Sequence, residues 1–241
     1  MSNGSEAMRS VDSAMETLRD DGDVLDLRGP EPQIALRRVP LVPIADGTYL
    51  RIWKRVLDIF GALVLLMALV PLLLAVAVAV RFSMGPGVVF RQERVGRKGR
   101  VFKIAKFRTM RHPWEIEGLA YEAGPEKTGA DPRHTRVGRL LRRTSLDELP
   151  QFWNVLKGEM SLVGPRPEMV HIASREDIWY HPRHAVRPGI TGPWQVSPDR
   201  SKHLHENLTH DIDYVSTVSL RGDLRLLFQT VGVVFLKPTG R

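Results

Sequence analysis

The segment IFGALVLLMALVPLLLAVAVAV, residues 59–80, contains no charged residue and lies between Asp58 and Arg81. As one helix, its 22 residues would be ~33 Å long, which is enough to cross a hydrocarbon core of ~30 Å. The segment therefore predicts a membrane protein. Pro71 lies near its middle, where the missing backbone N–H favours a break in the helix.

Basic residues flank this segment on both sides. They are Arg51, Lys54 and Arg55 before it, and Arg81, Arg91, Arg94, Arg97, Lys98 and Arg100 after it. Because cationic loops tend to stay on the cytoplasmic side, a segment that enters the bilayer, breaks at Pro71 and returns would keep both groups in the cytosol. Its two legs would be only ~18 Å and ~14 Å long. The charges and the proline alone leave a kinked spanning helix as the alternative.

Composition limits what the remainder can be. The 241 residues, 43% of them hydrophobic, leave room for one soluble domain beside the membrane segment. Residues 1–50 hold five basic and nine acidic residues, so the total of +8 leaves +12 on the rest. This charge indicates lipid head groups or phosphorylated substrates as partners, and no recognition helix or aromatic-basic stripe supports nucleic acid. The absence of cysteine excludes disulfides, thiol catalysis and cysteine-ligated zinc.

Three parts follow along the chain. Residues 1–48 predict a disordered acidic tail without a secretory signal, and residues 49–82 a proline-broken membrane helix. Residues 83–241 predict a cytosolic catalytic domain with a short β-hairpin within residues 88–110, a long loop over 113–130 and helices over 140–157, 168–179, 204–218 and 220–236. The last two helices are expected at the membrane interface. The expected fold class is α+β, mostly helical.

The proposed helix over residues 140–157 contains a conflict. Ser145 and Glu148 match a capping box, yet Pro150 would then lie inside the helix without an N–H to donate. A start near Leu149, with Pro150 as the first helical residue, resolves this conflict. Both readings place Asp147 and Glu148 at a helix N-terminus. Residues 161–167 predict a turn-rich loop, and residues 187–193 contain too much proline and glycine for regular structure.

Asp147 and Glu148 are two adjacent carboxylates among basic residues, with Arg139, Arg142 and Arg143 before them and Arg166 after them. An ionised acid in such surroundings can attack phosphorus as a nucleophile or bind a hard divalent cation through oxygen. The simpler alternative is that both acids only stabilise the first turn of a helix. The basic residues could likewise form only a solvated face or a lipid contact.

Several ordered motifs resemble the bacterial sugar transferase family, the monotopic phosphoglycosyl transferases. The resemblance covers about residues 51–236. Its motifs are KRVLD (54–58), FRQERVG (90–96), KFRTM (106–110), DPR (131–133), RVGR (136–139), TSLDELPQ (144–151), WNVLKG (153–158), MSLVGPRP (160–167) and RPGITG (187–192). Each motif alone is weak, but their number and order make accidental similarity improbable.

The resemblance implies transfer of a sugar-1-phosphate from a UDP-sugar to a polyprenyl phosphate such as undecaprenyl phosphate, with release of UMP. It implies that Asp147 is the nucleophile that forms an acyl-phosphate, that Glu148 assists, and that Mg²⁺ offsets charge on the diphosphate with Asp147 as a ligand. It also implies a re-entrant anchor, a cytoplasmic-facing catalytic domain at the bacterial inner membrane, and a first step in exopolysaccharide, capsule or glycoconjugate assembly. Downstream glycosyltransferases would then be partners in the pathway.

Five further side chains are candidates for substrate binding. Arg166, between two prolines, offers a guanidinium fork of restricted mobility for phosphate. Lys106 and Arg108 are the next candidates for phosphate, and Arg187 and Gln195 flank the Pro/Gly loop, where they could contact nucleotide. A catalytically silent membrane scaffold that binds anionic lipids or partner proteins through the basic domain is the alternative function.

Overall fold

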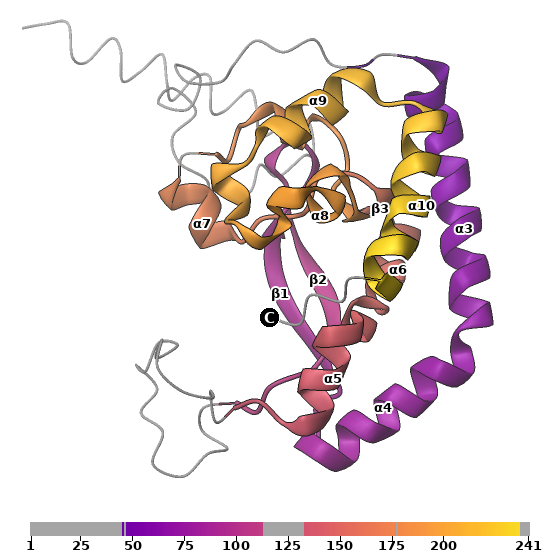
Figure 1. The fold of residues 1–241 in the computed structure, drawn as a ribbon, viewed down its shortest axis with the longest axis vertical. Helices are drawn as coiled ribbons and strands as arrows, with labels where there is room; N and C mark the ends of the chain where they lie inside the picture. The colour runs from indigo at the N-terminus through magenta and orange to yellow at the C-terminus, as the bar shows by residue number, and fades with distance from the viewer. Residues whose placement is uncertain (1–44, 46, 113–132, 177, 237–241) are drawn as a thin grey trace, which may run out of the picture.

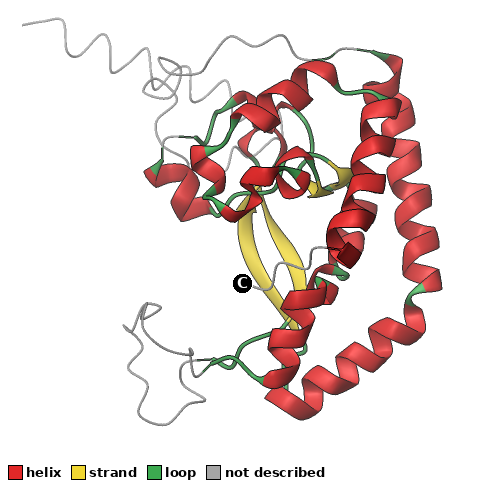
Figure 2. Cartoon of the chain, viewed as in Figure 1, coloured by secondary structure: helices red, strands yellow, loops and turns green. Residues whose placement is uncertain are grey.

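The computed structural model describes residues 45, 47–112, 133–176 and 178–236. The described chain is mostly helical with two small two-stranded sheets, which confirms the α+β class (Figures 1 and 2). Nearly all of the predicted tail over residues 1–48 and of the predicted loop over residues 113–130 lie outside the described residues. The division into three domains therefore stays a prediction.

The apolar segment forms two helices at an angle. A π-helical turn, Tyr49–Trp53, leads into α3, Lys54–Ala68, and α4 follows as Val70–Met84. Within the described residues no single helix has the length and apolar character to cross a bilayer, and the two together, bent by 64°, pass the same test. Figure 1 shows the pair as a bent arm along one edge of the molecule.

The break lies at Leu69, two residues before the proline that predicted it. Leu69 has φ −95° and ψ 5°, while Pro71 occupies the second position of α4. A proline at the start of a helix costs little because its N–H would have no intrahelical partner there. Pro71 thus begins the second helix.

The predicted hairpin is confirmed. Strand β1, Val89–Val95, pairs antiparallel with β2, Val101–Phe107, from Val89 opposite Phe107 to Val95 opposite Val101. A short 3-10 turn, Arg97–Gly99, joins them. The turn needs positive φ at Lys98 (57°) and Gly99 (75°), so the chain can reverse within three residues.

The predicted helix over residues 140–157 is wrong as a single element. Helix α5, Arg136–Thr144, ends at Ser145 in the left-handed conformation (φ 57°), and α6 covers Gln151–Lys157. A 3-10 turn, Leu146–Glu148, lies between them. Ser145 makes no capping hydrogen bond, so the capping box does not form. Pro150 is the N-cap of α6, one residue before the first helical position that the second alternative gave it.

Two segments expected to be irregular form a parallel pair. Strand β3, Ser161–Val163, lies beside β4, Gly189–Thr191. Their close approach explains the glycines, because a Cβ on Gly189 would lie 2.1 Å from the Gly164 nitrogen and one on Gly192 would lie 1.9 Å from the Gly164 oxygen. Each segment taken alone contains residues typical of turns, so the local sequence did not predict a strand. The pairing could not be seen locally because it joins segments more than twenty residues apart.

The remaining helices are short apart from the last. They are α7, Val170–Arg175; 3-10 turns at Pro182–Ala185, Pro198–Ser201 and Leu204–Glu206; α8, Pro193–Val196; α9, Thr209–Thr217; and α10, Leu220–Leu236. The predicted helices over residues 168–179 and 204–218 are therefore too long, because each begins in non-helical backbone or a 3-10 turn. The prediction for residues 220–236 is confirmed.

A buried polar cluster joins the beginning of α3 to the beginning of α10, which run side by side in Figure 1. Lys54 Nζ lies 2.5 Å from the Asp223 carboxylate, to which the Tyr49 and Tyr214 hydroxyls donate at 2.6 and 2.7 Å. All three partners bond to the Asp223 carboxylate, so its buried negative charge is paired with Lys54 and hydrogen-bonded by the two tyrosines. The base of the bent arm is thereby fixed to the C-terminal helix.

Candidate active site

The turn that carries Asp147 and Glu148 is held by the residues around it. Leu146 and Leu149 pack against a buried apolar cluster that includes Val80 of α4 and Phe107 of β2. The positive φ of Ser145 lets α5 end abruptly, so the two acids leave the helix axis. The acids therefore lie where the second leg of the bent arm meets the hairpin.

Glu148 is engaged by two cations. Its Oε1 accepts a hydrogen bond from Lys106 Nζ at 2.7 Å and a weaker contact from Arg166 Nη2 at 3.4 Å. Burial alone would raise the pKa of this carboxyl, but the two positive charges outweigh it and lower the pKa to about 2. Glu148 is therefore an ionised acceptor that already has its partners.

Asp147 differs from its neighbour. No side chain of a described residue bonds to its carboxylate, which is only partly exposed. Burial raises its pKa, the negative charge of Glu148 raises it further, and Lys106 and Arg142 offset part of the increase, which leaves the pKa at about 6. The carboxylate is thus ionised at neutral pH, basic for an aspartate, and without a side-chain partner among the described residues.

The two acids therefore differ in chemical character. A pair of carboxyl groups whose surroundings drive their pKa values apart is typical of a site in which one acid reacts and the other holds charge. Asp147 has the more basic oxygen, whereas Glu148 keeps Lys106 and Arg166 together. This arrangement suits attack on an electrophile that brings its own negative charge, such as phosphorus in a diphosphate.

Two arginines, the buried Arg183 and the partly buried Arg94, fix the loop that carries Arg166. Arg183 Nη2 donates to the Arg166 carbonyl at 2.5 Å, and Arg94 Nη1 donates to the Pro167 carbonyl at 3.1 Å. Arg183 also pairs with Asp211 at 2.8 Å, and both side chains are 0% exposed. The Arg166 guanidinium then lies 6.0 Å from the centre of the Trp194 ring, a cation–π geometry.

Sequence reasoning did not assign a role to Arg94, Arg183 or Trp194. Arg94 and Trp194 occur in or beside motifs that carried the resemblance, which was the available signal. Nothing local marks Arg183, because its partners Arg166 and Asp211 are 17 and 28 residues away.

The structure brings together four of the predicted site residues: Asp147, Glu148, Lys106 and Arg166. Gln195 lies next to Trp194 in α8, and its Oε1 has no hydrogen-bond partner among the described residues. These positions leave the predicted roles of all five residues in place as predictions.

Two predicted residues lie apart from the acids. Arg108 is 4% exposed and donates to the carbonyls of Met84 and Pro86, at the end of α4. Arg187 donates through Nε to the Gly158 carbonyl at 2.9 Å, at the end of α6. Both guanidiniums therefore close helix ends or turns, and a substrate contact would have to be additional to these bonds.

The donor set is compatible with Mg²⁺ held jointly by protein and substrate. No group of three or more His, Cys, Asp or Glu side chains that could hold a metal occurs in the described part of the chain. Mg²⁺ is, however, commonly bound by one or two carboxylates together with waters and substrate phosphates. The Asp147 carboxylate, with no side-chain partner, fits this role, and Glu148 does not because two cations already surround it.

Comparison with known proteins gives the family. The sequence model of the family described as bacterial sugar transferase matches residues 49–237 of the 241. The chain therefore belongs to the bacterial sugar transferase family, and the region matched contains the bent arm, the two acids and α10.

Several relatives carry more specific names. The UDP-glucose:undecaprenyl-phosphate glucose-1-phosphate transferase of Escherichia coli (strain K12) is 40% identical over 204 residues, which are 80% of this chain and 43% of that protein. The UDP-N-acetylgalactosamine-undecaprenyl-phosphate N-acetylgalactosaminephosphotransferase of Aeromonas hydrophila is 40% identical over 187 residues, 75% of this chain and 43% of that protein.

A third relative has nearly the same length as the matched region. The exopolysaccharide production protein PSS of Rhizobium leguminosarum bv. phaseoli is 38% identical over 190 residues, 74% of this chain and 92% of that protein. The chain thus spans less than half of the two longer relatives but most of this one. The names of the longer relatives specify different sugars at the same identity, so similarity does not assign the sugar here.

Proposed function

We propose that this protein transfers a sugar-1-phosphate from a UDP-sugar to a membrane polyprenyl phosphate such as undecaprenyl phosphate and releases UMP. The observation that carries the proposal is the contrast between Asp147, a basic carboxylate without side-chain partners, and Glu148, which holds Lys106 and Arg166 beside it. Family membership and the names of the relatives support the same reaction class.

In the first step an Oδ atom of Asp147 attacks the phosphorus nearest the sugar. The new O–P bond replaces the bond to the bridging oxygen, which leaves with UMP, and a covalent aspartyl phosphosugar remains. Lys106 and Arg166 counter the negative charge of the incoming diphosphate, because two anions would otherwise repel. Arg94 and Arg183 keep Arg166 in place through the loop carbonyls.

In the second step an oxygen of the polyprenyl phosphate attacks the same phosphorus. The O–P bond to Asp147 breaks, the carboxylate is regenerated, and a polyprenyl diphosphate sugar forms. When bound, Mg²⁺ supplies positive charge to the diphosphate oxygens. Asp147 would hold it through the carboxylate oxygen that does not attack.

The lipid substrate requires that the site reach a bilayer, and exposed apolar side chains support this part of the proposal. Two of the most exposed are Phe60 of α3 (65%) and Phe82 of α4 (86%). Leu220, Leu224, Phe228 and Val231 add an exposed apolar row on α10. Apolar surface of this extent is rare on a water-soluble monomer. We place α3 and α4 in the cytoplasmic leaflet of the inner membrane as a re-entrant pair.

A nucleotide-release assay tests the catalytic proposal. Membranes or detergent-solubilised protein with a panel of UDP-sugars and undecaprenyl phosphate should release UMP, and Asp147→Asn should abolish release because an amide is a poor nucleophile. Asp213→Asn is the matched control, since Asp213 is exposed on α9 and distant in the chain from the site. Undiminished release by Asp147→Asn would remove the nucleophile from the proposal.

Trapping separates the covalent route from direct transfer. Protein incubated with a UDP-sugar labelled in the phosphate next to the sugar, without lipid, should keep label on Asp147 after an acid quench, and hydroxylamine should release it. Absence of label with normal turnover would favour direct attack by the lipid phosphate. No UMP release with any UDP-sugar would favour the membrane scaffold instead.

A further inference from the structure

A surface pocket at the base of α3 is lined mainly by arginine. Its cavity of about 540 Å³ is bounded by Ala45, Leu50, Arg51, Arg55, Arg97, Ala185 and Arg187. The arginines come from the π-helical turn, α3, the hairpin turn and the segment before β4, so four parts of the chain direct positive charge to one place. No carboxylate is among the described residues that line it.

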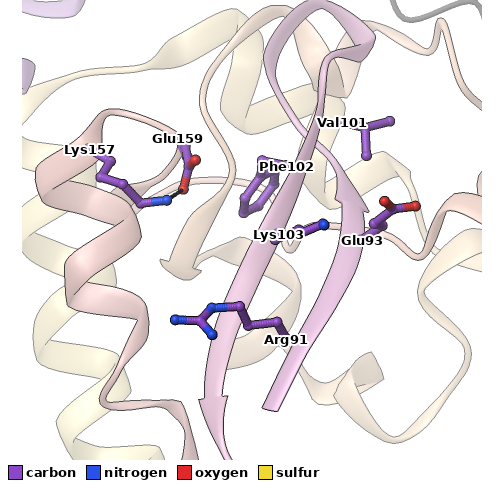
Figure 3. Close-up of a pocket in the computed structure, with 7 residues that line it drawn as sticks. All are labelled: Arg91, Glu93, Val101, Phe102, Lys103, Lys157 and Glu159. Carbon is purple, nitrogen blue, oxygen red and sulfur yellow. Dashed lines mark ion pairs between the residues drawn. The ribbon is translucent and has the colours of Figure 1, made fainter. Parts of the chain in front are cut away.

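A second pocket, on the hairpin, differs from the arginine-lined pocket because it also contains acids. Figure 3 shows that pocket, where basic residues alternate with Glu93 and Glu159. Lys157 and Glu159 pair there at 2.7 Å. Two acids thus offset part of the charge of three basic residues, and this partly compensated pocket serves as an internal comparison for the arginine pocket.

Three of the four arginines are fixed in position by backbone carbonyls. Arg55 donates from Nη1 and Nη2 to the last carbonyls of α6 at 2.6 and 2.8 Å. Arg97 and Arg187 each donate only through Nε, to carbonyls at 3.2 and 2.9 Å. Both terminal nitrogens of Arg97 and of Arg187 are therefore without a hydrogen-bond partner within the described ranges.

Carbonyls orient these guanidiniums but do not neutralise them. No acid in the described ranges forms a salt bridge with Arg55, Arg97 or Arg187. Burial lowers the pKa of Arg187, and the like charges of Arg97 and Arg55 lower it further. The nearby Asp58 carboxylate raises that pKa in part, although it forms no salt bridge with Arg187 and its Oδ1 accepts hydrogen bonds from Ser161 and Leu162. The pocket thus keeps a positive potential that an external anion would relieve.

From this geometry we propose that the arginine pocket binds a phosphate group, separate from the catalytic site. Several guanidiniums around one cavity match the many acceptor oxygens of a phosphate better than a single carboxylate. Arg97 lies at the turn of the hairpin, whereas Lys106 lies near the far end of β2. At ~3.3 Å per residue, Val101 and Lys106 are already ~17 Å apart along the strand, too far for one phosphate to bridge.

The phosphate could belong to a phospholipid head group or to a soluble compound. Arg51 and Arg55 precede the apolar part of α3, and Trp53 between them is 58% exposed. An exposed tryptophan beside arginines is typical of head-group depth. The lipid source rests on the membrane insertion proposed above, whereas phosphate binding itself does not.

The first arm of the test compares wild type with Arg51→Gln/Arg97→Gln in nanodiscs of phosphatidylcholine with or without phosphatidylglycerol. Native mass spectrometry of the released protein counts retained phosphatidylglycerol. We expect retention by the wild type and roughly tenfold or greater loss in the variant, because two positive charges of the pocket are removed. Arg91→Gln/Lys103→Gln, in the partly compensated pocket, is the control and should retain lipid.

The second arm titrates inorganic pyrophosphate into the same proteins in detergent. Loss of one heat-measured binding event in Arg51→Gln/Arg97→Gln, but not in the control, would identify a soluble phosphate as the ligand. If the variant matches the wild type in both arms, the proposal is overturned. UMP release by the same preparations reports on the catalytic proposal independently, so failure of one is distinguishable from failure of the other.

Discussion

Asp147 and Glu148 are neighbours in sequence with the same charge, yet their surroundings make them chemically different. Glu148 bonds Lys106 and Arg166, and its pKa falls to about 2, while Asp147 has no side-chain partner and a pKa of about 6. The pKa values differ in part because Lys106 and Arg166 bond to Oε1 of Glu148 and not to the Asp147 carboxylate. Site chemistry at this scale is therefore set by a strand and a loop that lie far from the acids along the chain.

The pH dependence of the first step should report the ionisation of Asp147. The protonated acid is a poor nucleophile, so UMP release should fall as the pH drops through about 6. Glu148→Gln removes the negative charge that helps to raise the pKa of Asp147. The fall of UMP release on the acid side of the pH profile should therefore move to lower pH, even where the rate of release is reduced. A profile of UMP release against pH measures both, and a fall at unchanged pH in Glu148→Gln would contradict the assignment.

Asp147→Asn should also make the folded protein more stable at neutral pH. The pKa of Asp147 is about 6 when folded against an ordinary 3.8, so above pH 6 the ionised group favours the unfolded chain. A neutral amide removes this cost, and thermal unfolding should move up by a few degrees. Below pH 3.8 both states hold the proton, so the difference should vanish. Asp213→Asn should show no such increase.

Membership of the candidate site was predictable where it depended on chemical type and not where it depended on distant partners. The acids among cations, Lys106 and Arg166 could be predicted, because phosphate chemistry needs such side chains together. The hydrogen bonds by which Arg94 and Arg183 hold the loop of Arg166 could not be predicted, because both go to backbone carbonyls of residues far away in the sequence.

At the scale of elements, the bent pair of α3 and α4 is the part of the protein that the proposal places in the membrane. Each helix has 15 residues, or ~22 Å, and is shorter than a ~30 Å hydrocarbon core. The bend of 64° at Leu69 turns the second helix away from the direction of the first. A bend of this kind fits either a broken span or a re-entrant pair, so the arrangement with both ends on one side stays part of the proposal.

Single cysteines can test this topology, because the natural chain has none. Gly47→Cys, before the arm, and Ser83→Cys, near its end, should react with a membrane-impermeant maleimide in inverted inner-membrane vesicles and not in intact spheroplasts. Phe60→Cys, in the apolar part of α3, is the control and should be protected in both. Labelling of one end from each side would show a spanning arrangement.

Elements differed in how well local sequence predicted them. The hairpin of β1 and β2 and the helix α10 were predicted because their apolar periods and turn residues are local. The pairing of β3 with β4 was missed, because proline and glycine there serve a close approach between distant segments. The break between α5 and α6 required Ser145 in a conformation that non-glycine residues rarely adopt.

At the scale of the whole molecule, the Arg183–Asp211 pair connects α9 to the loop that carries Arg166. Arg183→Met should leave Asp211 buried without its counter-charge and lower the free energy of unfolding by about 3–5 kcal/mol. Arg175→Met is the matched control, since Arg175 forms an exposed pair with Glu176 and its loss should cost at most about 1 kcal/mol. Urea unfolding measures both, and equal losses would contradict a structural role for the buried pair.

Gly164, Gly189 and Gly192 have a practical consequence for mutational screens. Even one added methyl at Gly189 or Gly192 would overlap the backbone of Gly164. Random mutagenesis scored by the proposed UMP release should therefore rank these positions beside Asp147, although they carry no functional group. Protein abundance measured in parallel would separate the two groups, because chains altered at the glycines should be degraded while those altered at Asp147 should accumulate.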